Sequence, residues 1–303
     1  MTAILLAVAP IFALIALGWA LRRWLWPSAD FWASIELLTY YVFFPALLIT
    51  TLAQARITWE VVPFLSVVVG VGLAVAGLLT VIRPLLRIDG PGYTSVFQGS
   101  IRFNTYLGLA TASALFGSEA VALLALAIAM MIFPVNILSI AVLARHAAAA
   151  PPGMAATLSE VARNPLIISS VAGLGFGALN LPLPPVIGPV LDILAKAALP
   201  LGLVAVGAGL NLGTVAARGT AVTVATALKL IVSPLLSLAA ARLLNLDPLA
   251  ATIAVLCGAL PPAPASYIMA RRLGGDHQLM AALITVHTLL AAITMPLFLA
   301  LVR

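Results

Sequence analysis

The stretch of residues 98–108, QGSIRFNTYLG, holds the side chains best suited to binding chemistry. Arg102 supplies a positive charge, and the side chains of Asn104 and Thr105 can each donate and accept hydrogen bonds. A charged side chain at the bilayer centre costs about 2.5–3.5 kcal/mol, so Arg102 requires a cavity, a partner or a ligand, unless it snorkels to an interface. This set of groups favours binding of an anion.

A second interruption of an apolar run lies at residues 259–267, ALPPAPASY. Pro261, Pro262 and Pro264 remove three backbone donors and clash with the preceding turn, so a continuous helix is not credible there. One proline would indicate a kinked helix, whereas three within four positions predict an unwound segment. Unwound backbone is tolerated at membrane depth only where protein or a water-filled cavity satisfies it.

The two interruptions would form one site if their segments cross. Half-helix ends would then face a single point near the bilayer midplane, and exposed N–H groups there suit a carboxylate. Asn136 and His287 are two more polar residues inside apolar runs, and either could line the same cavity. His287 could equally carry a proton or bond a backbone carbonyl. Lys229 is expected to snorkel to an interface. The candidate substrate-binding residues are Ser100, Arg102, Asn104, Thr105, Tyr106, Asn136, Pro261, Pro262, Ser266 and His287.

The elements that position these residues must lie in lipid. Of the 303 residues, 63% are apolar and 8% are charged, with a mean hydropathy of +1.20. Soluble domains carry about 25% charged residues, so a lipid bilayer is the expected surroundings. The net charge of +6 would suit nucleic acid, but the cations stand singly or in pairs at the ends of apolar runs. That placement is typical of membrane topology and predicts no nucleic-acid partner.

Catalytic and cofactor chemistry has few candidate residues. The chain has no nucleotide-binding loop, its three histidines lie far apart, and Cys257 is its single cysteine. A single cysteine excludes an intramolecular disulfide and a cysteine-based metal cluster. We therefore expect no enzyme, no cofactor and no metal site.

Ten apolar runs have the length of about 20 residues that a bilayer requires. The charges between them predict the orientation, because cytoplasmic connections are enriched in Lys and Arg. Connections after odd-numbered runs hold nine arginines and the opposite side holds three, so both termini are expected on the non-cytoplasmic side. The predicted spans are 3–21, 31–52, 61–82, 93–116, 120–144, 164–181, 186–211, 219–243, 248–272 and 278–301.

Prolines and helix breaks of the first half of the chain recur in the second half at similar offsets. Pro45 and Pro200 are 155 positions apart, Pro84 and Pro234 are 150 apart, and the break near Asn104 precedes that at Pro262 by 158. Five spans in each half would make the second half an inverted copy of the first, as in many secondary transporters. The predicted divisions are a first repeat at 1–144, a linker at 145–163 and a second repeat at 164–303.

These segments resemble the auxin efflux carrier family, which includes the plant PIN exporters and bacterial malate or malonate permeases. The resemblance covers essentially the whole chain. It is carried by Pro10-Ile11-Phe12 with Gly18, residues 44–48 (FPALL), 102–109 (RFNTYLGL), Asn164-Pro165-Leu166, residues 198–210 (ALPLGLVAVGAGL) and 259–262 (ALPP).

The resemblance implies a fold shared with bile-acid symporters and sodium/proton antiporters, in which the fourth and ninth helices are broken and cross. It implies a scaffold of helices 1, 2, 6 and 7, a transport domain of helices 3–5 and 8–10, an elevator-like motion and a homodimer. Asn104 matches the family's asparagine at the first crossing. At the second crossing Pro262-Ala263-Pro264 supplies no asparagine, and Ser266 is the nearest polar side chain.

The expected function is secondary transport of a small organic anion, such as a dicarboxylate or an auxin-like weak acid, in the cell inner membrane. Two alternatives stay open. One is a non-transporting receptor or scaffold with the same fold, and the other is a sodium-coupled symporter of a larger organic anion.

Overall fold

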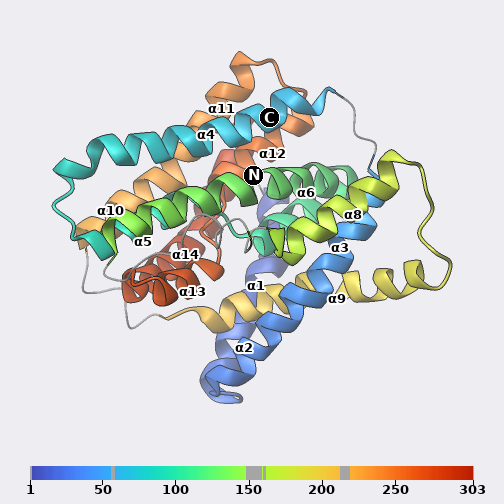
Figure 1. Ribbon diagram of the computed structural model, residues 1–303, viewed down its shortest axis with the longest axis horizontal. Helices are drawn as coiled ribbons and strands as arrows, with labels where there is room; N and C mark the ends of the chain where they lie inside the picture. Colours follow the sequence, from blue (N-terminus) through green and yellow to red (C-terminus); the bar gives the residue numbers. More distant parts are fainter. Residues whose placement is uncertain (1, 56–58, 148–158, 160–161, 212–218, 303) are drawn as a thin grey trace.

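The computed structural model describes residues 2–55, 59–147, 159, 162–211 and 219–302. Every regular element within those ranges is a helix (Figure 1). The predicted all-α membrane class is therefore confirmed. The predicted linker at 145–163 and the charges at Arg56, Arg218 and Arg303 lie wholly or partly outside the described residues.

The first half of the chain contains five predicted spans. The second of them is interrupted by a π-helical turn just before Pro45, which relieves the clash of the proline ring with the preceding turn. A kink at Gly117, with φ 76° and ψ −161°, separates the fourth span from the fifth. The helices are α1 (Thr2–Trp24), α2 (Ala29–Leu38), the π-turn (Thr39–Phe43), α3 (Phe44–Ala53), α4 (Val61–Ile82), α5 (Gly90–Ile101) and α6 (Thr105–His146).

The second half of the chain contains the other five predicted spans. Its third span contains a second π-helical turn, which precedes Pro234, whereas the π-turn of the first half lies in the second span. The helices are α8 (Pro165–Ala178), α9 (Ile187–Gly209), α10 (Gly219–Ala227), the second π-turn (Leu228–Val232), α11 (Ser233–Leu243), α12 (Pro248–Ala259), α13 (Ala265–Arg272) and α14 (His277–Val302).

Seven described segments are long and apolar enough to cross a membrane. One of them, Gly90–His146, has 57 residues and covers two predicted spans, because the Gly117 kink turns the chain within it. Two predicted spans appear as the shorter apolar helices α8 and α12. With these, the structure contains all ten predicted membrane segments, close to their predicted bounds.

Helices α5 and α12 correspond closely. Each has 12 residues, and their starts at 90 and 248 are 158 positions apart, the offset that separates Asn104 from Pro262. Each also begins at an aspartate whose carboxylate accepts backbone N–H groups, Asp89 from Gly92 and Asp247 from Leu249 and Ala250. Such a cap satisfies donors that the first helical turn leaves free.

Pro84 and Pro234 do not occupy equivalent positions in their spans. Pro84 lies in a 3₁₀ turn (Arg83–Leu85) that ends the third span, whereas Pro234 lies inside the eighth span. The two Pro-Leu pairs therefore occupy different depths, and their similar offset is no evidence for a repeat. Short Pro-Leu pairs recur easily in so apolar a chain.

Glycines let two pairs of helices approach closely. A Cβ atom on Gly207 of α9 would collide with the carbonyl oxygen of Ile15 in α1, and one on Gly18 would collide with that of Val204. In the same way a Cβ on Gly177 of α8 would lie 2.8 Å from the carbonyl oxygen of Leu52 in α3. Small residues at helix interfaces are typical of membrane bundles.

The helices gather into two groups, as Figure 1 shows. In one group α9 packs against α1, α2 and α3, and α3 packs against α8. In the other, α11 packs against α4 and α12, and α14 packs against α5, α12 and α13. The long helix α6 contacts both groups. The first span thus packs against the seventh, and the second span packs against the sixth.

Candidate functional site

The fourth and ninth spans are both broken where the sequence predicts. Helix α5 ends at Ile101, Arg102 adopts an extended conformation with ψ 153°, and α6 begins after Asn104. Helix α12 ends at Ala259, Leu260 is extended with ψ 140°, and α13 begins at Ala265. The prolines at 261, 262 and 264 explain the second break, because they cannot donate helical hydrogen bonds.

The two breaks meet. The backbone N–H of Asn104 donates a hydrogen bond of 2.7 Å to the carbonyl oxygen of Pro261. This bond joins positions 157 residues apart and satisfies backbone groups that each break leaves without a helical partner. The predicted crossing of spans four and nine is thus present, and Asn104, Pro261 and Pro262 lie at its buried centre.

Only the oxygen of the Asn104 side-chain amide is hydrogen-bonded among the described residues. Its Oδ1 atom accepts a bond of 3.1 Å from the N–H of Leu107 and so caps α6. Its Nδ2 atom is fully buried and has no hydrogen-bond partner among the described residues. A buried amide donor left without a partner costs about 1–3 kcal/mol. The crossing therefore carries a donor that an anionic or carbonyl ligand would satisfy.

Arg102 is held by the protein rather than by an interface. Its Nη2 atom lies 2.7 Å from Oδ1 of Asn136 and 3.1 Å from the Met269 sulfur, and its Nε atom lies 3.4 Å from Oγ of Ser139. Arg102 thereby connects the break in span four to α6 and α13, and it brings Asn136 to the site. Of the alternatives left open by the sequence, a protein partner is the one observed.

Thr105 and Tyr106 are the first two residues of α6, so their N–H groups have no acceptor within the helix. Thr105 is half-buried, which leaves it accessible beside the crossing. Tyr106 instead packs against α3 and α9, which belong to the helix group that contains α1. Its ring lies 4.3 Å from that of Phe44 in a T-shaped arrangement, and a Cβ on Gly202 would lie 2.6 Å from it. Tyr106 therefore links the helix groups.

The remaining candidates are not joined to the crossing by any hydrogen bond among the described residues. Ser100 is buried and donates to the carbonyl oxygen of Val96. Ser266 is fully buried, and its hydroxyl has no partner among the described residues. His287 is also fully buried, and neither of its ring nitrogens has a hydrogen-bond partner among the described residues.

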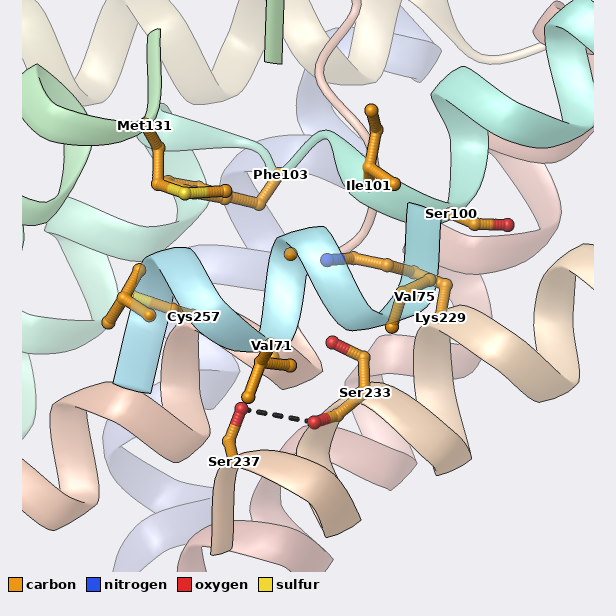
Figure 2. Close-up of a pocket in the computed structure, with 13 residues that line it drawn as sticks. Val71, Val75, Ser100, Ile101, Phe103, Met131, Lys229, Ser233, Ser237 and Cys257 are labelled. Atoms are coloured by element: carbon orange, nitrogen blue, oxygen red, sulfur yellow. Dashed lines mark hydrogen bonds between the residues drawn. The ribbon is translucent and has the colours of Figure 1, made fainter. Parts of the chain in front are cut away.

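A small cavity lies beside the crossing. Figure 2 shows that Phe103 of the fourth-span break lines it together with side chains of the neighbouring helices, and that the Lys229 side chain extends into it from the π-turn. Its volume is about 20 Å³. The lining residues include Ser100, Ile101, Phe103, Met131, Lys229, Ser233, Ser237, Cys257 and Gly258.

The expectation that Lys229 snorkels is wrong. Its side chain is 2% exposed, and it lies near the middle of the segment 219–243, too far from either end to reach an interface. The sequence reasoning also missed Ser139 and Met269, which hold Arg102. The central position of Lys229 in its apolar run could have predicted that its side chain is buried. Nothing in the sequence indicates that Ser139 and Met269 contact Arg102.

A comparison with curated proteins gives no match. Residues 153–299 match the model of a family described as membrane transport protein. The matched segment includes the ninth-span break and most of the predicted second repeat at 164–303. This match identifies residues 153–299 as a segment of the membrane transport protein family, which is the auxin efflux carrier type.

Proposed function

We propose that this membrane transporter is a secondary carrier of a small organic anion, a carboxylate such as a dicarboxylate or an auxin-like weak acid. The observation that carries the proposal is the Asn104–Pro261 crossing with its unpartnered Asn104 amide. Arg102 adds positive charge, and the N-terminus of α6 adds N–H groups that favour anions. Binding at such a crossing suits a ligand with a carboxylate group.

The arrangement of the helices supports transport by an elevator-like motion. Helices α1, α2, α3, α8 and α9 correspond to spans 1, 2, 6 and 7, and they would form the scaffold. The remaining spans, 3–5 and 8–10, would move as the transport domain and carry the crossing across the bilayer. The two groups would be assembled from two inverted repeats, as the shared offset of α5 and α12 supports.

The family resemblance supports a homodimer in the cell inner membrane. The excess of arginine after odd-numbered spans supports an orientation with both termini on the non-cytoplasmic side. The cycle would need no nucleotide, since binding energy and gradients drive a secondary carrier.

The test is counterflow in proteoliposomes. Vesicles loaded with malonate, succinate or indole-3-acetate would be exposed to the same acid in labelled form. We expect at least one acid to exchange, and Asn104→Ala to lower its initial rate at least tenfold, because a hydrogen bond to a charged group contributes about 1.5–3 kcal/mol.

Asn164→Ala is the matched control. Asn164 caps α8 by accepting from the N–H of Leu166 at 2.9 Å, as Asn104 caps α6, but it lies in the other helix group. Both substitutions remove a cap worth about 1 kcal/mol. Equal exchange by wild type and Asn104→Ala would contradict the assigned site. An acid that binds but is never exchanged would favour a receptor.

A further inference from the structure

Lys229 is a buried charge-bearing group that the crossing does not use. It lies in the π-helical turn Leu228–Val232, and its side chain is 2% exposed. An ionisable residue at membrane depth is costly and therefore commonly functional. In Figure 2 its nitrogen points toward α4, between Phe103 and Val71.

The surroundings of Lys229 offer no acidic partner. Helices α10, α11, α12, α14 and α5 pack against the π-turn, α4 also lines the cavity, and none of these helices contains Asp or Glu. The titratable groups within electrostatic reach are Cys257 on α12 and His287 on α14. No hydrogen bond to the Lys229 side chain occurs among the described residues. The neighbouring polar groups are the hydroxyls of Ser100 and Ser233.

The cavity is sized for a water molecule and excludes an organic substrate. Its volume of about 20 Å³ exceeds the roughly 10–15 Å³ that one water requires. An ammonium ion buried without a counter-charge is strongly disfavoured, whereas a neutral amine with one water is tolerated. Lysine changes its protonation state readily when it is buried.

We propose that Lys229 is the proton-binding site of the carrier, an inference that rests on the proposed transport of an anion. In this proposal the closed conformation holds Lys229 as a neutral amine, because none of the helices around the cavity supplies a counter-charge. When the cavity opens to water, its nitrogen lone pair takes a proton from solvent and forms an N–H bond. The resulting positive charge offsets one negative charge of the bound anion, so the loaded domain moves with less electrostatic cost. The empty carrier returns after the amine has released the proton on the other side.

The position of the cavity couples this proton to the site. Ile101 and Phe103 flank Arg102 in the break of span four, and both line the cavity. Gly258 lines it from α12, just before the break in span nine. A change of charge or hydration at Lys229 therefore acts on the backbone of both breaks. The proposal predicts transport linked to one proton per cycle and independent of sodium.

Transport measurements separate the proton site from the anion site. Proteoliposomes would receive an inward pH gradient, and accumulation of the exchanged acid from the panel of malonate, succinate and indole-3-acetate would be followed. We expect Lys229→Arg, which keeps a positive charge, to retain counterflow but to lose pH-driven accumulation at least tenfold. Lys229→Met, which lacks the charge, should lose accumulation as well and exchange the acid more slowly. The control Lys196→Met, an exposed lysine on α9, should accumulate like wild type. Accumulation retained by Lys229→Arg would show that a fixed charge suffices and would overturn the proposal. Loss of counterflow by Lys229→Arg would overturn it as well.

A second measurement needs no transported acid, so it distinguishes failure here from failure of the proposed function. Unfolding exposes Lys229 to water, where it binds a proton that the folded protein lacks. The stability of wild type relative to Lys229→Met should therefore rise with pH between 6 and 9, by up to tenfold in the unfolding equilibrium constant per pH unit. Lys196→Met should track wild type. Parallel profiles for wild type and Lys229→Met would overturn the proposal.

Discussion

Replacing Gly207 by alanine tests how tightly α1 and α9 pack. A Cβ at this position collides with the carbonyl oxygen of Ile15, which belongs to the backbone of α1 and cannot rotate away. The two helices must therefore separate along their contact, and they lose dispersion contacts on both sides. Overpacking of this kind costs about 1–3 kcal/mol.

Gly209, two residues further along α9, is the matched control. A Cβ there meets nothing within 4 Å. Both substitutions exchange glycine for alanine in the same helix, so their gains in helix propensity, up to about 1 kcal/mol each, largely cancel in the comparison. The difference between the two variants should therefore report the overpacking cost of about 1–3 kcal/mol.

The assay is unfolding of the purified protein by sodium dodecyl sulfate in mixed micelles, followed by tryptophan fluorescence. Gly207→Ala should unfold at a lower detergent fraction than Gly209→Ala, with Gly209→Ala at or above wild type. Two variants of equal stability would refute the close approach of α1 and α9.

Three further changes test the packing around the breaks. A double-mutant cycle of Arg102→Met and Asn136→Ala should give a coupling energy of about 1.5–3 kcal/mol in the same unfolding assay, because their bond of 2.7 Å is charge-assisted; a coupling near zero would contradict the assignment. Gly258→Ala should destabilise by about 1–3 kcal/mol, since its Cβ would lie 2.9 Å from the Pro234 backbone, and wild-type stability would count against that contact. Cys257, which is 5% exposed, should react with a water-soluble maleimide far more slowly in the native protein than in dodecyl sulfate, as measured by mass spectrometry; equal rates would show an open cavity.

The membrane segments and the two breaks could be predicted from the sequence, because each follows from local chemistry. The length of an apolar run sets the span, and the prolines at 261, 262 and 264 prevent a helix wherever they lie in the fold. The corresponding offset of 158 then recurred in the bounds of α5 and α12.

The partners of the polar side chains could not be predicted in this way. Arg102 could have snorkelled, bound a ligand or found a partner, and the choice of Asn136 depends on how α6 packs after the Gly117 kink. Tyr106 stands beside Asn104 in the sequence but faces Phe44, because successive residues of a helix point in different directions. The environment of Lys229 is formed by spans that are distant in the sequence.

The proposed function requires an anion to bind at the crossing through the Nδ2 donor of Asn104, which has no partner among the described residues. Asn104→Asp tests it most directly, because aspartate caps a helix as well as asparagine does but replaces the Nδ2 donor by a negatively charged acceptor. Counterflow of the exchanged acid should fall at least tenfold in Asn104→Asp, while Asn164→Asp, the same change at the cap of α8, should match wild type. Wild-type counterflow by Asn104→Asp would contradict the account.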